Sequence, residues 1–355
     1  MTRLALAGLG AAARKIHLAA CRHVPGLELV GGADPDAGAR AQFQRATRGV
    51  PVHEDLETLV ASTRPEWILI ASPPATHAEL ACRALERGVH VFCEKPFTES
   101  VADADRVLAA AARAGRSVVV NHEFARMPTH AALLASLGSS DFGEPLFLQA
   151  WQTMLPNEAD ASGWRAEGKT LQEFGTHVID LALRVFAVPP VAVTARMPRV
   201  PFPGAGGARD LVDLVALEFP GGRAASIVLD RVSAGRLRYL ELRLDGTRSS
   251  LRASLGGRAS LTLGCAPRSR RPFLRLGFGL GGMTWSERGD RTRVLARNPL
   301  DALGRATADL LRSAIEAVAQ GREPPSTGAE ARAVVRVVEA AYESARTGRT
   351  IELAG

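Results

Sequence analysis

Long apolar runs are missing from this 355-residue sequence. No stretch reaches the roughly 18 consecutive apolar residues that a transmembrane helix needs. The apolar run Leu4–Ala7 near the N-terminus is too brief for a secretory signal peptide. Both absences favour a cytoplasmic protein with no membrane partner.

Cysteine is also scarce, with four residues in the whole chain. They lie far apart in the sequence, at Cys21, Cys82, Cys93 and Cys265. Zinc sites and redox disulfides need closely spaced thiols. The sequence therefore predicts neither a metal centre nor a disulfide framework.

Lysine is the rarest charged residue, because only Lys15, Lys95 and Lys169 are lysines among the 44 basic residues. Arginine supplies positive charge everywhere else. A retained lysine is a candidate for a task that arginine performs poorly, such as shifting its pKa or donating from a compact ammonium group. The net charge of +7 does not indicate a nucleic-acid partner, because the arginines are scattered and a binding face needs clustered charge.

The sequence does contain enough apolar material for two cores, since its length exceeds the roughly 250–300 residues at which one core stops growing. From Arg3 to Val120, short apolar runs alternate with alanine-rich helical segments. This alternation is typical of a parallel sheet covered by helices on both faces. The predicted strands are Leu4–Ala7, Leu27–Ala33, Trp67–Ala71, Val89–Cys93 and Ser117–Val120.

Beyond Asn121 the pattern changes to strands with few helices between them. Pro220-Gly221-Gly222 and Asp245-Gly246 are typical of hairpin turns, which indicates a mostly antiparallel sheet. The predicted strands are Val191–Arg196, Leu211–Phe219, Arg223–Asp230, Tyr239–Leu244 and Ser249–Leu255, and the predicted closing helices are Leu300–Gln320 and Ala329–Arg346. We therefore predict an α/β protein with a doubly wound Rossmann domain over residues 1–121. An α+β domain with an open, mostly antiparallel sheet is expected over residues 122–355, and its closing helices can pack back on the first domain.

A dinucleotide-binding fingerprint follows the first predicted strand. Gly8 allows the tight turn, Gly10 allows the backbone to approach a pyrophosphate, and the small Ala13 allows the helix to pack closely on the strand. Asp34 ends the second strand, roughly 20 residues further on, where a carboxylate binds the ribose 2′-hydroxyl. Because this carboxylate would repel a 2′-phosphate, the sequence favours NAD over NADP. A plain glycine turn is the alternative interpretation.

Several motifs outside this fingerprint match those of one known family. Glu94-Lys95-Pro96 follows the predicted strand Val89–Cys93. The other matching segments are Ala71-Ser72-Pro73-Pro74-Ala75-Thr76-His77, Trp164-Arg165, Leu171-Gln172-Glu173-Phe174-Gly175-Thr176-His177-Val178-Ile179-Asp180, Glu218-Phe219-Pro220-Gly221-Gly222 and Ala340–Arg349. Together they resemble the Gfo/Idh/MocA oxidoreductases, the family of glucose-fructose oxidoreductase and inositol dehydrogenase.

The resemblance implies an NAD-dependent dehydrogenase that acts on a sugar, cyclitol or similar polyol. It implies that Lys95 lies between cofactor and substrate, that His177 donates or accepts the proton, and that Glu173 takes the place of a usual aspartate. The residues expected to contact the cofactor, besides the fingerprint, are Ser72, Pro73, His77, Glu94 and Lys95. The residues expected to contact the substrate are Lys95, Trp164, Arg165, Glu173, His177 and Asp180.

The spacing of three of these residues supports the same assignment. Glu173, His177 and Asp180 stand at i, i+4 and i+7, on one face of a helix. Such a polar stripe can simply be solvated, but its apolar neighbours predict a half-buried helix whose polar face lines a cleft. A histidine suits the proton exchange that accompanies hydride transfer at neutral pH, and Lys95 can stabilise the developing alkoxide.

Two segments depart from the family pattern. Gly168-Lys169-Thr170 replaces a longer glycine-rich stretch before the helix, and Arg126 is one place nearer to Pro128 than expected. Lys169 and His122 therefore either line the substrate pocket or belong to a mobile loop. The remaining histidines near strand ends and on the first helix, His17, His23 and His90, are interpreted as structural or surface residues.

Two other functions stay open on the sequence alone. Tightly held NAD can support a redox-neutral elimination or glycosidic cleavage of a sugar, and the same fold can serve as a non-catalytic NAD-binding scaffold or sensor. The second sheet needs cover on the face away from its helices. We therefore expect a homodimer or homotetramer built on that sheet.

Overall fold

The computed structural model of the chain describes residues 1–153, 169–201, 208–233, 239–256, 258–265, 272–279 and 281–353. Its residues form two units. The first is made of Met1–Arg126 and Leu303–Arg336, and the second of Met127–Ala302 and Val337–Gly355. Each unit has its own large sheet and is described by itself.

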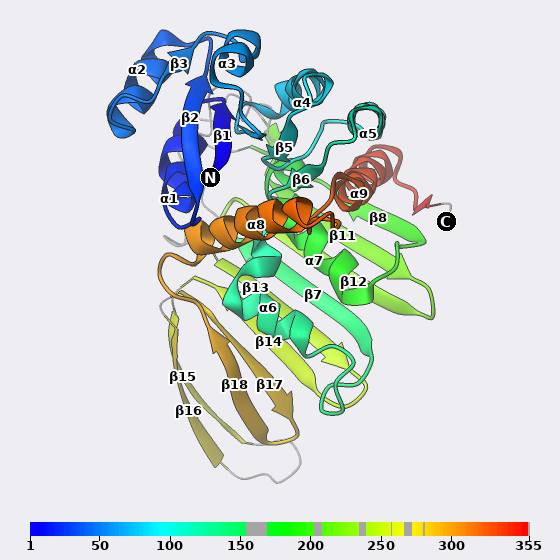
Figure 1. Ribbon diagram of the computed structural model, residues 1–355. Coiled ribbons are helices and arrows are strands. Elements are labelled where there is room, and N and C mark those ends of the chain that lie inside the picture. Colours follow the sequence, from blue (N-terminus) through cyan, green and yellow to red (C-terminus); the bar gives the residue numbers. More distant parts are fainter. Residues whose placement is uncertain are drawn as a thin grey trace. The chain divides into compact units, whose positions relative to one another are not determined.

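A six-stranded sheet forms the centre of the first unit, with the strand order β3-β2-β1-β4-β5-β6 (Figure 1). Every neighbouring pair in it is parallel. The strands are β1 (Thr2–Ala7), β2 (Leu27–Ala33), β3 (Val52–His53), β4 (Trp67–Ile70), β5 (His90–Cys93) and β6 (Val118–Val120). The predicted Rossmann arrangement is confirmed, and β3 is a strand that the sequence did not predict.

Side chains of β1 alternate between two apolar cores. Leu4 and Leu6 belong to the core that contains Leu310 and Leu311 of α8, whereas Ala5 and Ala7 point into the core built with α3, α4 and α5. The helices of this unit are α1 (Leu18–Cys21), α2 (Ala37–Ala46), α3 (Leu56–Thr63), α4 (His77–Glu86), α5 (Val101–Ala114), α8 (Ala302–Ala319) and the first part of α9 (Gly328–Thr347). Helices cover both faces of the sheet, as is usual for a parallel sheet.

Local signals set where these helices begin and end. Asp36, Asp55 and Ser100 precede α2, α3 and α5, and each side chain accepts a backbone N–H from the first turn of its helix. Gly115 ends α5 in the left-handed region, with φ of 60°. These caps fix where the helices begin and end relative to the strands that precede them.

A nine-stranded sheet forms the second unit, in the order β18-β17-β14-β13-β7-β12-β11-β8-β19. Only β12 and β7 pair in parallel among these strands, so the predicted mostly antiparallel sheet is confirmed. Its strands are β7 (Pro145–Thr153), β8 (Ala192–Arg196), β11 (Val212–Phe219), β12 (Arg223–Asp230), β13 (Tyr239–Gly246), β14 (Ser250–Leu255), β17 (Met283–Arg288), β18 (Arg291–Arg297) and β19 (Ile351–Glu352). Two further hairpins pair β9 (Arg199–Pro201) with β10 (Ala208–Asp210) and β15 (Arg258–Cys265) with β16 (Pro272–Gly279).

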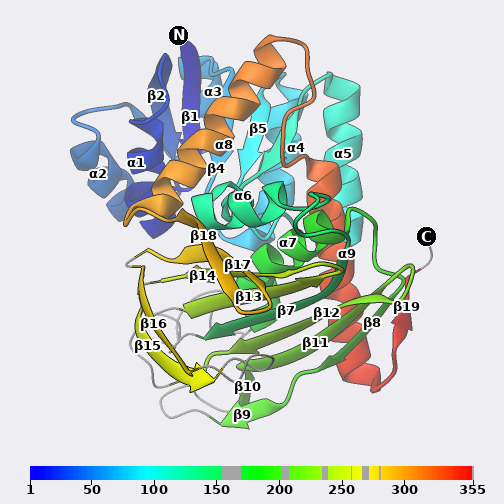
Figure 2. The ribbon, with the colours of Figure 1, turned by 90° about the horizontal axis from the view of Figure 1, so that it is seen from below.

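The two faces of the nine-stranded sheet differ in burial. Figure 2 shows α6 (Pro128–Ala135) and α7 (Thr176–Phe186) on the same side of β7, β13 and β14. Alternate residues of β7, such as Leu148 and Ala150, are buried on that side, while Trp151, the residue after Ala150, is 49% exposed. Leu214 of β11 is 46% exposed on the same open face as Trp151. The sheet therefore has one covered and one open face, the usual state of an antiparallel sheet.

The closing helices α8 and α9 match the predicted helices to within a few residues. In the part of the chain that the structure describes, no helix combines the length and apolar character needed to cross a membrane. The cytoplasmic location stays a prediction.

Candidate active site

The turn after β1 has the geometry that a pyrophosphate needs. Gly8 has φ of 89°, and a Cβ placed on it would lie 2.5 Å from the backbone nitrogen of Ser72. A Cβ on Gly10 would meet nothing within 4 Å, so the space above this residue is open. Ala13 is fully buried in the following helix. Only glycine fits at position 8, and the backbone at position 10 is accessible to a phosphate group.

The carboxylate of Asp34 lies beside this turn. Its Oδ2 accepts a hydrogen bond from the backbone N–H of Leu9 at 2.8 Å, and its Oδ1 accepts one from the N–H of Asp36 at 2.9 Å. The carboxylate is therefore fixed at the carboxyl end of β2, next to the glycine turn. This is the position at which a Rossmann fold binds the adenosine ribose.

His77 joins the loop after β4 to the segment after β5. Its Nδ1 lies 2.8 Å from the carbonyl oxygen of Pro96, and its Nε2 lies 2.9 Å from the carbonyl oxygen of Ser72. The ring is buried, and burial lowers the pKa of His77 despite these two contacts. Both ring nitrogens are engaged by backbone, so the side chain shapes the loop that carries Ser72 and Pro73.

Glu94, directly after β5, accepts a converging set of hydrogen bonds. Asn121 Nδ2 lies 2.8 Å from Glu94 Oε1, and the backbone N–H of Lys95 lies 3.2 Å from Oε2. His17 Nε2 approaches Oε1 to 2.7 Å. Burial opposes ionisation of the carboxyl group, but the hydrogen bond from His17 and the charges of His17 and Lys95 outweigh it and lower the pKa of Glu94 to about 2.

Lys95 is half-buried, and its peptide bond to Pro96 is cis. The lysine thus follows a fixed carboxylate at the carboxyl edge of the sheet. The pairing of Glu94 with His17 was not predicted. The two residues are far apart in the sequence, and no local pattern marks a histidine on the first helix as a partner for the end of β5.

The helix that carries the second group of predicted residues begins with a π turn over Leu171–Gly175 and continues as α7. Glu173, His177 and Asp180 are 6%, 2% and 2% exposed. Their shared face is therefore not a solvated stripe. Such π turns are frequently found at functional sites.

Glu173 and Asp180 each lie beside an arginine. Arg231, which is 3% exposed, brings its Nη1 to 3.5 Å from Glu173 Oε2, and its guanidinium lies 4.5 Å from the centroid of the Phe174 ring. Arg184 Nε donates to Asp180 Oδ2 at 2.9 Å. Each of these two carboxyl groups therefore has an arginine partner, and the two stand on either side of His177 along the helix.

A buried acid pair anchors the first turn of this helix. Asp210 Oδ2 accepts the backbone N–H of Thr170 at 3.3 Å and the hydroxyl of Tyr342 at 3.2 Å. The same hydroxyl accepts the N–H of Gln172 at 3.4 Å. Burial first, and then Asp210, raise the pKa of Asp213 to about 10. Asp213 therefore holds a proton at neutral pH.

This anchor was missed in the sequence, although a signal for it exists. Asp213 occupies an inward-facing position in the alternation of β11, and an acidic residue at such a position needs a partner. Arg231, directly after β12, was also missed, because it is distant in the sequence from Glu173 and Phe174 and meets them only in the fold.

Two other residues are placed away from these groups. Arg126 Nη1 lies 3.3 Å from Asp309 Oδ2 of α8, and His90 stacks on Trp67 with ring centroids 4.9 Å apart. Lys169 is exposed but lies at the start of the helix, where it forms a backbone bridge with Asp210 and its carbonyl oxygen accepts the Glu173 N–H. The predicted substrate residues Trp164 and Arg165 lie outside the described residues. Among the described residues, no group of His, Cys, Asp or Glu side chains is arranged to hold a metal ion.

The predicted site residues thus form two groups, one in each unit. Gly8, Asp34 and Glu94 gather with Lys95 along one edge of the first unit's sheet, and Glu173, His177 and Asp180 share a helix face of the second unit. Each group is internally organised by buried polar contacts. Their catalytic and binding roles stay predictions.

Comparisons with known proteins give the same division. Residues 2–122 match the model described as "Oxidoreductase family, NAD-binding Rossmann fold", and residues 130–252 match the model described as "GFO/IDH/MocA C-terminal domain". The chain is 26% identical over 365 residues to a D-apiose dehydrogenase of Paraburkholderia graminis, which covers 98% of this chain and 89% of that protein. It is 36% identical over 129 residues to an inositol 2-dehydrogenase of Rubrobacter xylanophilus, covering 36% of this chain and 37% of the relative.

Solved structures resemble the chain over nearly its whole length. An oxidoreductase from Agrobacterium radiobacter in complex with NAD+, L-tartaric acid and magnesium has a TM-score of 0.82 at 21% identity, covering 99% of this chain and 98% of that one. The WlbA dehydrogenase from Bordetella pertussis in complex with NADH and UDP-GlcNAcA has a TM-score of 0.79 at 20% identity, covering 100% of this chain and 98% of that one. At these identities the likeness establishes a shared fold.

Proposed function

The chain belongs to the Gfo/Idh/MocA family of oxidoreductases with an NAD-binding Rossmann fold, and from this premise we propose that it exchanges a hydride between nicotinamide and a secondary alcohol or ketone of a sugar, cyclitol or related polyol. The arrangement of Lys95 beside a fixed carboxylate in one unit, and of a buried His177 between two carboxylates in the other, is the observation that supports it. The names of the relatives, D-apiose dehydrogenase and inositol 2-dehydrogenase, favour the same substrate class.

In this proposal the chain's residues manage the proton while bound NAD supplies the hydride acceptor. His177 takes the proton that the substrate hydroxyl loses, and Lys95 donates a hydrogen bond to the same oxygen to stabilise its developing negative charge. Glu173 and Asp180 stand on either side of His177 on the helix and stabilise the imidazolium that forms. Arg231 holds Glu173 in place through the ion pair between them.

NAD rather than NADP is the proposed cofactor. The Asp34 carboxylate is held beside the glycine turn, where it would accept hydrogen bonds from a ribose hydroxyl and repel a 2′-phosphate. Ser72 and Pro73 would line the same edge, since the Gly8 backbone already contacts the Ser72 backbone.

Turnover of a substrate panel tests the proposal. The purified protein with NAD+ should produce NADH from at least one aldose, cyclitol or polyol. Lys95→Ala should lower that rate by about a hundredfold or more while NAD+ still binds. Lys15→Ala, which removes an exposed lysine of the first helix, is the matched control and should leave the rate unchanged. Unchanged turnover in Lys95→Ala would remove the role assigned to this lysine.

Product analysis separates the alternatives. A redox-neutral elimination or glycosidic cleavage would consume sugar over many turnovers and return the cofactor as NAD+. A scaffold or sensor would bind NAD+ in calorimetry and convert no member of the panel. The proposed dehydrogenase forms one NADH for each ketone or lactone produced.

We further propose that the open face of the nine-stranded sheet binds a second copy of the chain. Trp151, Val228 and Leu214 stand directly opposite one another on β7, β12 and β11, so they form an apolar stripe across three strands. Trp151 and Leu214 are about half exposed. A large aromatic residue in the middle of an open sheet is typical of the centre of an interface.

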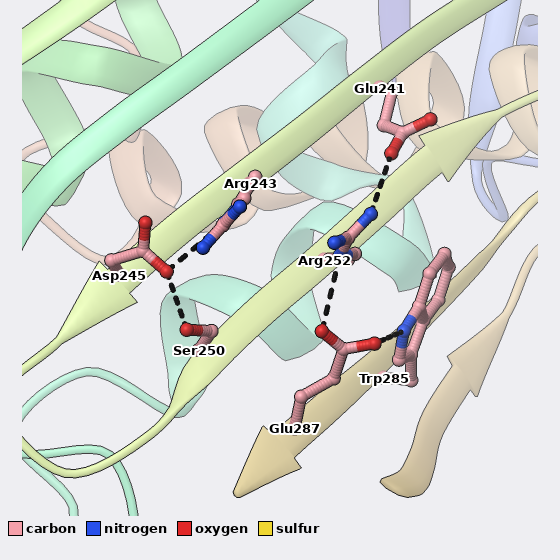
Figure 3. Close-up of polar contacts among 7 residues, drawn as sticks. All are labelled: Glu241, Arg243, Asp245, Ser250, Arg252, Trp285 and Glu287. Carbon is pink, nitrogen blue, oxygen red and sulfur yellow. Dashed lines mark hydrogen bonds and ion pairs between the residues drawn. The ribbon is translucent and has the colours of Figure 1, made fainter. Parts of the chain in front are cut away.

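Polar side chains border the apolar stripe and are already paired with one another. Arg252 bridges Glu241 and Glu287 at 3.3 and 3.2 Å, and Glu287 also accepts the indole N–H of Trp285 at 3.0 Å (Figure 3). Figure 3 shows these side chains on one face of β13, β14 and β17. An apolar centre surrounded by hydrogen-bonded polar residues is typical of a protein interface. In a symmetric dimer, the same face of each copy would contact the other.

Light scattering tests this assembly. The wild type should have the mass of a dimer or tetramer, and Trp151→Asp with Leu214→Asp should reduce it to a monomer. Leu300→Asp, at a residue that is 82% exposed outside the sheet, is the control and should keep the wild-type mass. A monomeric wild type at micromolar concentration would rule the assembly out.

A further inference from the structure

The helix that begins with the π turn and continues as α7 is held at its start by residues from distant parts of the chain. The first N–H groups of a helix have no partner within it and usually bond to a side chain just before the helix. The Thr170 hydroxyl, which stands at this position, instead donates to the carbonyl oxygen of Asp210 at 2.6 Å. The N–H groups of Thr170 and Gln172 donate to Asp210 Oδ2 and to the Tyr342 hydroxyl. Asp210 and Tyr342 thus do the work of a local cap.

Tyr342 occupies the centre of this arrangement. Its hydroxyl accepts the N–H of Gln172 at 3.4 Å and donates to Asp210 Oδ2 at 3.2 Å, so α9 and β10 meet at the start of the helix. A backbone bridge between Asp210 and Lys169 holds the same place. Burial, and then the carboxyl groups of Asp210 and Asp213, raise the pKa of the Tyr342 hydroxyl above its ordinary value. The hydroxyl therefore keeps its proton near neutral pH and remains a donor.

The segment fixed in this way is the π turn itself. Gln172 lies within the turn Leu171–Gly175, directly before Glu173, and the turn leads into α7 at Thr176 and His177. A π turn departs from the regular hydrogen-bond ladder of the α-helix. Contacts from outside the helix therefore help to set its shape, and its shape determines where Glu173 and His177 lie. A displacement of a reacting group by about 1 Å can lower a rate about a hundredfold.

We propose that Tyr342, held by Asp210, is a positioning residue that sets the shape of the π turn and through it the placement of His177. It acts through the backbone of Gln172 and needs no contact with substrate or cofactor. The effect on the turn is a property of the second unit alone. The consequence for turnover rests on the proposed function, in which His177 exchanges the proton of the substrate hydroxyl.

A second hydroxyl of α9 provides a matched control. Ser344 is fully buried, accepts the N–H of Ala195 at 2.9 Å, and donates to the carbonyl oxygen of Arg349 at 2.6 Å. It ties α9 to β8 instead of to the π turn. Ser344→Ala therefore removes a hydroxyl with two hydrogen bonds from the same helix, as Tyr342→Phe does. Loss of stability alone should appear in both variants, whereas loss of positioning should appear only in Tyr342→Phe.

Amide hydrogen exchange of the full chain tests the effect on the turn without any turnover. Exchange of residues 170–177 should become roughly tenfold faster in Tyr342→Phe, because the Gln172 N–H loses its acceptor. It should keep the wild-type rate in Ser344→Ala. Asp210→Asn retains an acceptor oxygen and should protect this segment better than Asp210→Ala. Wild-type exchange of the segment in Tyr342→Phe, or equal acceleration in Ser344→Ala, overturns the proposal.

Steady-state kinetics with NAD+ and a polyol that the wild type oxidises test the consequence for the reaction. Tyr342→Phe should lower kcat by about tenfold or more and leave the KM for NAD+ unchanged, since the cofactor turn belongs to the other unit. Ser344→Ala should keep the wild-type kcat. A wild-type kcat in Tyr342→Phe contradicts the positioning role. A wild type that oxidises no polyol removes the proposed function instead, and hydrogen exchange then decides whether Tyr342 shapes the turn.

Discussion

Asp213→Asn should stabilise the protein, and the gain should grow with pH. Asp213 is fully buried beside Asp210, and its pKa is raised from 3.8 to about 10. In the unfolded chain the side chain is ionised at pH 7, so folding must add a proton to it. An asparagine presents a similar neutral donor to Asp210 without this cost.

The sign and size of the expected stabilisation follow from the pKa of Asp213 in the unfolded and in the folded chain. A carboxyl group whose pKa is raised in the folded state destabilises that state as the pH rises, from about pH 4 until the pH reaches about 10. Each pH unit above the unfolded pKa costs about 1.4 kcal/mol, which sets an upper limit of about 4 kcal/mol at pH 7. If the substitution recovers about 2 kcal/mol of this limit in the free energy of unfolding, Tm should rise by roughly 4–8 °C.

Thermal unfolding at several pH values between about 5 and 8 measures the effect as the difference in Tm between Asp213→Asn and wild type. Other carboxyl groups titrate alike in both proteins and cancel in this difference. Asp210→Asn is the matched comparison and should destabilise the protein, because it weakens the acceptor of the Thr170 N–H and the Tyr342 hydroxyl. If Asp213→Asn lowers Tm equally at pH 5 and pH 8, Asp213 does not hold the proton and the reasoning is refuted.

Two further substitutions probe the two halves of the site. Gly8→Ala places a Cβ 2.5 Å from the Ser72 nitrogen at a φ of 89°, so the NAD+ affinity measured by calorimetry should fall at least about tenfold. Gly49→Ala is the control, because Gly49 has a φ of 101° but open space around its Cβ, and it should leave the NAD+ affinity intact. Equal NAD+ affinities in the two variants would contradict the turn assignment. Arg231→Met removes the guanidinium beside the buried Glu173 and should lower the free energy of unfolding in urea by about 3 kcal/mol. Adding Glu173→Gln should restore part of that loss, and a double variant no more stable than Arg231→Met would argue against the ion pair.

The sequence predicted the features that rest on local patterns. The strand with its glycine turn and the aspartate at the end of the next strand could be read directly, because turn geometry and strand periodicity depend on neighbouring residues. The closing helices were predicted closely for the same reason. The strand β3, with two residues, is too short to show any periodicity.

The contacts that organise the site could not be read in this way. His17 pairs with Glu94, and Arg231 with Glu173, only because strands and helices distant in the sequence come together in the fold. The strand β7 was also missed, although it lies in the middle of the nine-stranded sheet between β12 and β13. Its parallel pairing with β12 joins residues separated by the whole of α7 and its neighbours, which no local pattern reveals.

A crystal structure of the protein with NAD and a polyol substrate or inhibitor tests the central claim most directly. We expect the nicotinamide at the carboxyl end of β5, with Lys95 Nζ and a ring nitrogen of His177 both within about 3.2 Å of one substrate oxygen. A complex in which either side chain points away from that oxygen, or in which the pyrophosphate does not lie against the turn of Gly8 and Gly10, would contradict it.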